Sequence, residues 1–374
     1  MLYPKLFFEL LRKQGIVFFA GVPDSILKSF SAYVTDHAAK GNHVICANEG
    51  NAIGLAIGYH LATKKVALTY LQNSGLGNVI NPLLSLADSE VYSVPVLIVV
   101  GWRGEPGVKD EPQHKKQGRV MLAMLDAMEI PYRIMPRDHK AADNTIQEAI
   151  NYMKENGAPF ALIVREGTFD SYTLKDVQKQ SIPLTREDAI KLIIDSLEDE
   201  DIVVSTTGMS SREVFEYREE LNQGHGRDFL TVGGMGHASQ IALGIANQKP
   251  NRKVLCLDGD GAAIMHMGAM AINGVQNCEN FIHIVLNNGA HASVGGQPTV
   301  GFDISFKEVA RAVKYKTILG AETSEEIIQG IAMLKKKKGP AFLEIRVNKG
   351  YRKDLGRPTI TPAENKNAFM EFLG

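Results

Sequence analysis

Residues 254–290 read VLCLDGDGAAIMHMGAMAINGVQNCENFIHIVLNNGA, and they hold the most specific pattern of the chain. A short apolar run ends in DGDG at 258–261, an apolar stretch at helical spacing follows, and a second apolar run ends in NNG at 287–289. This order predicts a strand, a glycine-rich turn, a helix and a second strand. In a parallel sheet the two strand ends lie side by side, so Asp260 and Asn288 can reach one point although they are distant in the sequence. Their side-chain oxygens are ligands that Mg²⁺ prefers.

An ordinary dinucleotide-binding turn is the main alternative for this stretch. That motif expects a third glycine where the sequence has Ile264, and it expects backbone rather than an acidic side chain near the pyrophosphate. Asp260 would repel a bare diphosphate, so a cation has to lie between them. The spacing between GDG at 259–261 and NN at 287–288 resembles the cofactor motif of the thiamine diphosphate-dependent decarboxylase family. The resemblance implies thiamine diphosphate (ThDP) and Mg²⁺ as cofactors.

Composition and charge narrow the class of protein. The chain has 374 residues, enough for two domains, and its 44% hydrophobic and 22% charged residues are typical of a globular protein. A net charge of −1 gives no electrostatic argument for nucleic acid or an anionic membrane as a partner. Charged residues interrupt the apolar N-terminal segment, which therefore fits neither a signal sequence nor a membrane span. The three cysteines have no paired spacing, so we expect buried free thiols and a cytoplasmic location.

Strands and helices are predicted to alternate along the chain. The apolar pattern predicts a helix over residues 3–14, a strand over 17–20 and then a second helix. This alternation favours parallel sheets with helices on both faces, an α/β fold of doubly wound domains. Further strands are predicted near 43–47, 66–71, 95–100, 160–165, 202–205, 229–232, 254–257, 281–286 and 341–347.

The second half of the sequence echoes the first. Residues 154–163 resemble 336–345, and residues 54–58 resemble 241–245, at offsets of roughly 182–188 positions. Similar segments at a similar offset indicate two copies of one α/β domain.

The predicted domains are residues 1–170 and 185–374, joined by a polar linker at 171–184. In this order they resemble the pyrimidine-binding (PYR) and diphosphate-binding (PP) domains of the ThDP family. Many members carry a third domain between these two, and this chain has no room for it. We therefore expect no nucleotide or flavin binding by a middle domain.

Glu49 stands directly after a predicted strand and at the start of an apolar helical pattern. Taken alone, this position is typical of a first-turn acid that interacts with the helix dipole. The resemblance implies a further role, because a glutamate at this place of the PYR domain hydrogen-bonds N1′ of the aminopyrimidine in the family. That contact favours removal of the C2 proton of the thiazolium, which makes the nucleophile. We expect Glu49 to be this glutamate.

Two glycine-rich turns of the second half each follow a predicted strand and open a helix. The turn at 231–238 resembles the family's pyrimidine clamp, with the Gly233 carbonyl on the 4′-amino group and Met235 wedged under the cofactor. A core methionine is the alternative. In the other turn, Ser210 and Glu213 have the spacing of a capping box. A helix N-terminus preceded by small residues also binds diphosphate, so the two roles are compatible there.

The resemblance assigns residues to each part of the cofactor. For the metal, the family uses the GDG aspartate, the second asparagine of NN and a backbone carbonyl two residues on, which are Asp260, Asn288 and Ala290 here. Asp258 is either a second acid behind the metal site or only the end of its strand. The expected cofactor-binding set is Glu49, Gly208, Met209, Ser210, Gly233, Met235, Gly259, Asp260, Gly261, Ala262 and Asn288.

Three loops of the first half, at 21–25, 72–78 and 101–114, follow strands at the carboxyl edge of the predicted sheet, where α/β domains bind ligands. A fourth, charged stretch follows the last strand and is either a binding segment or a surface loop. Asp24 and His114 are the titratable candidates for proton transfer. The expected substrate-binding set is Asp24, Ser25, Asn73, Arg103, Lys109, His114, Arg352 and Arg357.

These loops and the missing middle domain resemble the family members that decarboxylate 3-phosphonopyruvate to phosphonoacetaldehyde and CO₂ in phosphonate biosynthesis. Local cations would bind the phosphonate, because a chain with a net charge of −1 cannot attract it globally. Sulfopyruvate or another 2-oxo acid is the alternative substrate, and a non-catalytic nucleotide-binding protein on the same fold is a further hypothesis. The resemblance also implies a homodimer or higher homo-oligomer in which Glu49 and Asp260 of one site belong to different chains.

Overall fold

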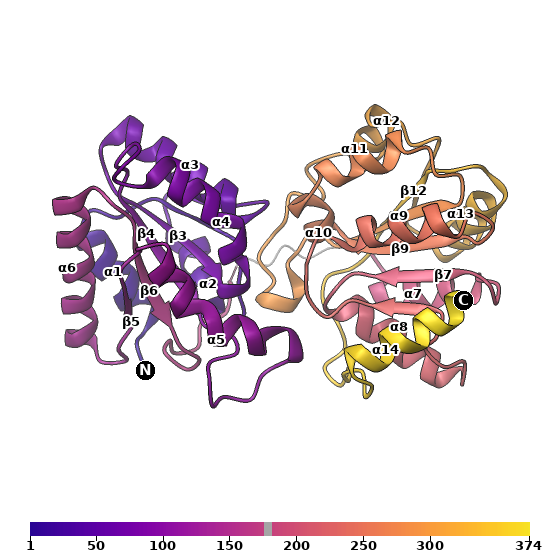
Figure 1. The fold of residues 1–374 in the computed structure, drawn as a ribbon, viewed down its shortest axis with the longest axis horizontal. Coiled ribbons are helices and arrows are strands. Elements are labelled where there is room, and N and C mark those ends of the chain that lie inside the picture. The colour runs from indigo at the N-terminus through magenta and orange to yellow at the C-terminus, as the bar shows by residue number, and fades with distance from the viewer. Residues whose placement is uncertain (176–181) are drawn as a thin grey trace. The chain divides into compact units, whose positions relative to one another are not determined.

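The computed structural model describes residues 1–175 and 182–374. They form two compact units, one from each range, except that residues 294–297 group with the first unit (Figure 1). The predicted linker covers residues 171–184, and its central residues, 176–181, lie outside the described residues. The domain limits therefore remain a prediction.

Among the described residues, the first unit is built around a six-stranded parallel sheet in the order β2-β1-β3-β4-β6-β5. Its strands are β1 (Phe19–Gly21), β2 (His43–Ile45), β3 (Ala67–Gln72), β4 (Val96–Gly101), β5 (Tyr132–Ile134) and β6 (Phe160–Val164). Its helices are α1 (Pro4–Lys13), α2 (Lys28–His37), α3 (Glu49–Thr63), α4 (Leu76–Pro82), α5 (Pro112–Ala127) and α6 (His139–Asn156), with short turns η1 (Asn73–Gly75) and η2 (Leu83–Ala87).

The second unit, within the part of the chain that the structure describes, has a six-stranded parallel sheet in the order β11-β12-β10-β9-β7-β8. Its strands are β7 (Ile202–Ser205), β8 (Asp228–Leu230), β9 (Val254–Gly259), β10 (Phe281–Asn287), β11 (Thr317–Ala321) and β12 (Ala341–Arg346). Its helices are α7 (Arg186–Asp195), α8 (Met209–Glu220), α9 (Ala238–Gln248), α10 (Asp260–Met265), α11 (Gly268–Val275), α12 (Phe306–Ala312), α13 (Ser324–Lys336) and α14 (Pro362–Leu373), with a short turn η3 (Ala292–Val294).

The two sheets have the same topology. If the strands of the second unit are renumbered 1 to 6 in chain order, so that β7 is strand 1, the second sheet has the order 2-1-3-4-6-5 from the β8 edge. The first sheet has the same order. The similar segments 54–58 and 241–245 lie in α3 and α9, each of which follows the second strand of its unit. The other similar pair, 154–163 and 336–345, covers a helix end and the sixth strand of each unit. The prediction of two doubly wound α/β domains is confirmed.

The residues of one strand alternate between two apolar cores, because successive side chains point to opposite faces of a sheet. On β9, Leu255 and Leu257 are buried with residues of α7, α8 and α13. Val254 and Cys256 of the same strand are buried with residues of α9, α12 and α14. Strands that are apolar on both faces form continuous hydrophobic runs in the sequence, which explains why the pattern identified them.

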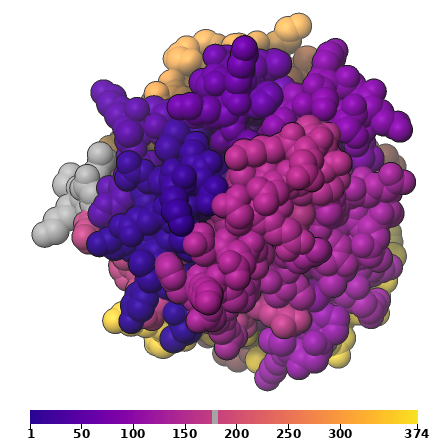
Figure 2. Space-filling view, turned by 90° about the vertical axis from the view of Figure 1, so that its left-hand side faces the viewer, coloured from indigo at the N-terminus to yellow at the C-terminus, as the bar shows by residue number. Residues whose placement is uncertain are grey.

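The helices of the first unit also cover their sheet. Residues of α1, α2 and α6 form one core with it, and α3 packs against β1, β3 and β4. Figure 2 shows the face of this unit on which the indigo N-terminal residues lie beside the magenta residues of α6. The Gln14 side chain, at the end of α1, donates a hydrogen bond to Gln147 of α6 (2.8 Å).

The sequence pattern does not predict two of the strands, β5 and β11. Each is an edge strand of its sheet, and its side chains are mostly half-exposed rather than buried. An edge strand packs on fewer neighbours than a central one, so its sequence carries fewer apolar residues and a weaker pattern.

The three cysteines, Cys46, Cys256 and Cys278, are free and buried, as predicted. Burial raises the pKa of the Cys46 thiol to about 11, so this thiol stays protonated near neutral pH and is a poor nucleophile. No helix of the described residues combines the length and the apolar character that crossing a membrane requires.

A fully buried ion pair joins α8 to β8 in the second unit. The Arg218 guanidinium donates through Nε to Asp228 Oδ2 (2.9 Å) and through Nη2 to Asp228 Oδ1 (3.0 Å), and both side chains are at most 1% exposed. The Asn365 side chain, from α14, donates to the Asp228 backbone carbonyl (2.9 Å). Removal of either charge would leave the other one buried without its counter-charge.

Replacement of Arg218 by alanine should lower the free energy of unfolding by about 3–5 kcal/mol, because Asp228 would become an unpaired buried charge. Urea unfolding at pH 7, followed by circular dichroism, measures this change. Arg311→Ala is the control, since the Arg311–Glu308 pair is exposed and solvent weakens such pairs. Equal losses in the two variants would contradict the expected effect of burial.

Candidate active site

Four neighbouring strands of the second sheet, in the order β8-β7-β9-β10, end at one edge of that sheet. Because these strands are parallel, their carboxyl ends meet there, and open α/β sheets bind ligands at such edges. The predicted cofactor residues follow these strands in turn: Gly233 and Met235 after β8; Gly208, Met209 and Ser210 after β7; Gly259, Asp260, Gly261 and Ala262 where β9 meets α10; and Asn288 and Ala290 after β10.

Asp260 is the first residue of α10 and is 3% exposed. Its carboxylate accepts hydrogen bonds from the Thr299 hydroxyl and from the backbone amides of Asn288 and Gly261. The Asn288 contact brings together the two predicted side-chain ligands of the metal. Burial is the main influence on the Asp260 pKa and raises it to about 6, because these hydrogen bonds do not fully replace water around the charge.

The surroundings of Asp260 fit a divalent cation. The hydrogen-bond donors just named are neutral, and a buried carboxylate is costly to ionise without a counter-charge. The Asn288 side-chain oxygen accepts from the Ala290 amide (2.9 Å), and this oxygen and the Ala290 carbonyl are the other predicted metal ligands. A dication bound among these oxygens would lower the Asp260 pKa, since a nearby positive charge favours the ionised form.

The N-terminus of α8 fits an anion. Gly208 is the N-cap, with a φ of 99° that favours glycine, and no side chain of the described residues caps this helix. The capping-box alternative for Ser210 and Glu213 is therefore wrong. Glu213 instead forms a buried ion pair with Arg186 through two hydrogen bonds of 2.7 Å. First-turn amides without a side-chain acceptor, at the positive end of a helix dipole, are suited to a diphosphate.

Met235 and His291 lie against the first turn of α10. A Cβ added to Gly261 would meet Met235 Cε at 3.4 Å and His291 Cε1 at 3.1 Å. The predicted pyrimidine clamp and the GDG turn are therefore neighbours, and Gly261 gives the two side chains room. Burial lowers the pKa of His291 to about 4, so its ring is neutral at pH 7.

Sequence reasoning missed three residues near Asp260, namely His291, Thr299 and Gly301. Thr299 donates to the carboxylate, and a Cβ at position 301 would lie 2.6 Å from Asp260 Oδ2. A signal for this loop was present, because GGQPTVG at 295–301 is rich in glycine and small polar residues soon after NNG. Such stretches form loops that approach ligands closely.

In the first unit, Glu49 is the first residue of α3 and is 6% exposed. Its Oε2 accepts a hydrogen bond from Asn78 Nδ2 (2.7 Å). A side chain at Gly75 would collide with it, because an added Cβ would lie 2.3 Å from Glu49 Oε1. The cap of α3 is the Asn48 side chain, which accepts from the Asn51 amide (3.0 Å). Glu49 is therefore not the cap, and its place in the first turn also suits the helix dipole.

Asp24 is fully buried in the turn after β1. Its Oδ2 accepts from the amides of Ile26 and Leu27 (3.0 Å each), and its Oδ1 accepts from Gln72 Nε2 (2.7 Å). Burial outweighs these contacts and raises the Asp24 pKa above its usual range. A buried carboxyl group of this kind is suited to proton transfer.

Arg103 is oriented by Asp110 and Ser25. Its Nε and Nη2 donate to the Asp110 carboxylate, and its Nη1 donates to Ser25 Oγ (2.7 Å). The Asn73 side chain exchanges two hydrogen bonds with the Arg103 backbone (2.8 and 3.1 Å). The side-chain bonds found among the described residues use three of the five guanidinium N–H groups. The structure thus brings the predicted residues Ser25, Asn73 and Arg103 together.

His114 lies in the first turn of α5 and is 9% exposed. Its Nδ1 is buried and has no hydrogen-bond partner among the described residues. Burial is the main cause that lowers the His114 pKa, and the Arg103 charge acts in the same direction, so the ring is neutral at pH 7. Two other predicted substrate residues, Lys109 and Arg357, are exposed.

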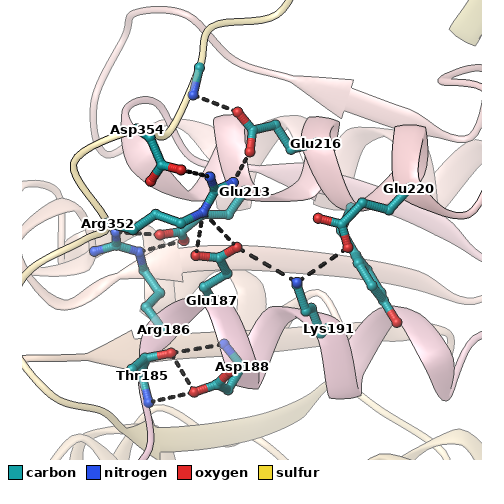
Figure 3. Close-up of polar contacts among 12 residues, drawn as sticks. Thr185, Arg186, Glu187, Asp188, Lys191, Glu213, Glu216, Glu220, Arg352 and Asp354 are labelled. Atoms are coloured by element: carbon teal, nitrogen blue, oxygen red, sulfur yellow. Dashed lines mark hydrogen bonds and ion pairs between the residues drawn. The ribbon is translucent and has the colours of Figure 1, made fainter.

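Arg352 belongs to an ion-pair cluster within the second unit (Figure 3). Its guanidinium contacts Glu187 on α7 (3.0 Å), Glu216 on α8, and Asp354 in its own loop (3.4 Å). Glu216 also accepts a hydrogen bond from the Gly356 amide (2.5 Å). These contacts tie the loop after β12 to α7 and α8, which accounts for Arg352 without a substrate.

Two family models match parts of the chain that contain predicted site residues. Residues 1–130 match the N-terminal TPP binding domain of the thiamine pyrophosphate enzymes, and residues 206–345 match their C-terminal TPP binding domain. Thiamine pyrophosphate (TPP) is another name for ThDP. The first match contains Glu49, and the second contains Asp260 and Asn288.

Several relatives cover most or half of the chain. Phosphonopyruvate decarboxylase of Streptomyces viridochromogenes is 30% identical over 96% of this chain and 92% of that protein. Sulfopyruvate decarboxylase of Methanosarcina acetivorans is 25% identical over 98% and 96%. The alpha subunit of sulfopyruvate decarboxylase of Methanocaldococcus jannaschii is 31% identical over 42% of this chain and 89% of that subunit. The beta subunit is 34% identical over 50% of this chain and 96% of that subunit. The chain therefore belongs to the thiamine diphosphate-dependent decarboxylase family.

Proposed function

We propose that this decarboxylase converts 3-phosphonopyruvate to phosphonoacetaldehyde and CO₂, with ThDP and Mg²⁺ as its cofactors. The observation that carries the metal is the buried Asp260 carboxylate beside Asn288, because the donors that reach it among the described residues are neutral. Similarity to a phosphonopyruvate decarboxylase over 96% of the chain supports the substrate.

The second unit would hold the charged end of the cofactor. Asp260, Asn288 and the Ala290 carbonyl would bind Mg²⁺, and the amides at the start of α8, around Met209 and Ser210, would bind the diphosphate. Bound ThDP supplies a carbon nucleophile at C2 and takes up the electrons that are released as CO₂ leaves. Asp260 would hold the metal, and through the metal the diphosphate, in place.

The first unit would supply the acid–base groups. Glu49, held by Asn78, would bind N1′ of the aminopyrimidine. Asp24 and His114 would take part in proton transfer: the raised pKa of Asp24 favours its protonated form, which can donate, and the lowered pKa of His114 favours its neutral form, which can accept. Arg103 would bind the phosphonate through its two remaining N–H groups, and its ion pair with Asp110 would keep the guanidinium plane oriented.

3-Sulfopyruvate is the second candidate substrate, supported by similarity to a sulfopyruvate decarboxylase over 98% of the chain. A guanidinium fork can bind a sulfonate or a phosphonate, so the two acids have to be compared directly. Purified protein with ThDP and Mg²⁺ is incubated with each acid, and the aldehydes are identified by NMR and mass spectrometry. Turnover of 3-phosphonopyruvate with the higher kcat/KM supports the proposal, and turnover of sulfopyruvate alone refutes it.

Asp260→Ala should weaken ThDP binding in excess Mg²⁺ by more than about 100-fold, because it removes the charged ligand of the proposed metal site. Calorimetric titration measures the affinity. Asp199→Ala is the control, since the Asp199 side chain is 97% exposed in the same unit. Undiminished affinity in the Asp260 variant would reject the metal assignment.

Glu49→Gln should keep the fold and most of the ThDP affinity but slow exchange of the C2 proton of bound ThDP. A carboxamide cannot stabilise a protonated N1′ as a carboxylate does. NMR after an acid quench measures the exchange rate. A wild-type rate in this variant would make Glu49 a structural residue.

The same variant tests the proposed homo-oligomer, in which Glu49 and Asp260 of one site come from different chains. Mixing Glu49→Gln with Asp260→Ala protein under conditions of subunit exchange should restore activity at the sites that receive both native residues. Two inactive proteins that never complement would indicate sites built within one chain.

Arg103→Ala should mainly raise KM for 3-phosphonopyruvate, which corresponds to a loss of about 1.5–3 kcal/mol in binding free energy. The enzyme's preference for 3-phosphonopyruvate over pyruvate should become smaller. Arg103→Lys keeps a charge beside Asp110 but lacks the planar fork, so it separates recognition from loss of the ion pair. Arg352→Ala is the contrast, because its contacts predict lower stability with an unchanged preference. Equal losses toward both acids in Arg103→Ala would contradict a role in phosphonate binding.

A further inference from the structure

A buried polar network lies directly behind the turn that carries Asp260. Asp258 Oδ2 contacts His283 Nε2 (3.3 Å), and His283 Nδ1 contacts the Tyr315 hydroxyl (3.1 Å). Asp258 Oδ1 accepts from the Gly259 amide (3.1 Å). Asp258, His283 and Tyr315 are 1%, 0% and 4% exposed, so their polar groups depend on other protein groups for hydrogen bonds instead of on solvent.

The chemistry of the three groups sets the direction of this network. A carboxylate only accepts hydrogen bonds, so His283 carries a proton on Nε2 and donates it to Asp258. A ring whose single proton is on Nε2 has an acceptor at Nδ1. Burial raises the Tyr315 pKa, so its hydroxyl stays protonated and donates a hydrogen bond to His283 Nδ1. Each hydrogen bond therefore points toward the Asp258 carboxylate.

The contact between His283 and Asp258 joins two adjacent strands diagonally. In the register of β9 and β10, His283 pairs with Cys256, and Val285 pairs with Asp258. The strand ends beyond this contact carry Asp260 on one side and Asn288 on the other. A change in the distance between the strands would thus change the separation of the two proposed metal ligands.

A metal ion held by Cys256, Asp258 and His283 is the alternative. The donor atoms of these three residues lie within 4.8 Å of one another. However, both nitrogens of His283 already have hydrogen-bond partners. Burial also raises the pKa of the Cys256 thiol well above its usual value, and a protonated thiol is a poor metal ligand. The contacts favour a hydrogen-bonded network.

We propose that Asp258, His283 and Tyr315 form a positioning triad that holds β9 and β10 at the separation that Asp260 and Asn288 need to bind one Mg²⁺. The triad residues act on the ion through the turn and the strand ends. This inference rests on the proposed Mg²⁺ site. Groups that orient metal ligands in this way typically change metal affinity about 10–100-fold.

Tyr315→Phe and His283→Phe test the triad, with Mg²⁺ titrated calorimetrically into protein and excess ThDP. The first variant removes one hydrogen bond, and the second removes both. Each should raise the Mg²⁺ dissociation constant about 10-fold or more, while kcat recovers at saturating Mg²⁺. His283→Gln, whose amide can still donate to Asp258, should stay closer to the wild type.

Phe342→Leu is the matched control, because its ring packs beside His283 and Tyr315 at 5.6 Å from each ring. This variant should lower the unfolding temperature of the ligand-free protein without a change in Mg²⁺ affinity. Triad variants that lose thermal stability but keep the wild-type Mg²⁺ affinity would overturn the proposal. If His283→Phe does not fold, Tyr315→Phe decides, since it removes only a hydroxyl.

Two further measurements separate this inference from its foundations. Wild-type protein that shows no Mg²⁺-dependent ThDP binding would refute the proposed function itself, whereas equal Mg²⁺ affinity of wild type and triad variants refutes the triad alone. Elemental analysis of purified protein tests the alternative. One equivalent of zinc that is lost in Cys256→Ala would overturn the triad in favour of a metal site.

Discussion

An ionised carboxylate inside a protein needs a positive charge or several strong donors, and Asp260 meets this requirement only in part. Backbone amides and the Thr299 hydroxyl reach it, yet its pKa remains raised to about 6. The fold places this acid where parallel strands end and helices begin, so that oxygens and amides of four turns lie at one sheet edge. The chemistry proposed for the second unit depends on this incomplete compensation, because it makes the binding of a dication together with its diphosphate favourable.

Much of this arrangement could be predicted from the sequence, for a physical reason. Asp260 and Asn288 follow two buried strands, and buried parallel strands carry long apolar runs that are easy to identify. Once the sheet was parallel, their ends had to lie at the same edge. The edge strands β5 and β11 lack such runs, and Thr299 and Gly301 come from a loop whose path no periodic pattern describes. Their positions depend on tertiary contacts that the sequence does not display.

Arg103 and Arg352 show a second limit of sequence reasoning. Both follow strands and both lie in charged loops, so they were equivalent candidates for phosphonate binding. The structure gives Arg103 one carboxylate, that of Asp110, while Arg352 contacts three acids. One of these, Glu187, lies 165 positions away in the sequence, so the neutralisation of Arg352 could not be anticipated from its loop. The charge balance around an arginine, rather than its loop, decides how well it can bind an anion.

Each unit has its own sheet and its own apolar cores, and no strand ladder of the described residues runs between the two sheets. A break in the chain between the two units would therefore leave every described strand pairing intact. What the connection does ensure is equal synthesis of the two halves and a high effective concentration of each near the other. Two separate polypeptides of this design would depend on matched expression and on their mutual affinity, whereas a single chain delivers both halves in a ratio that cannot drift.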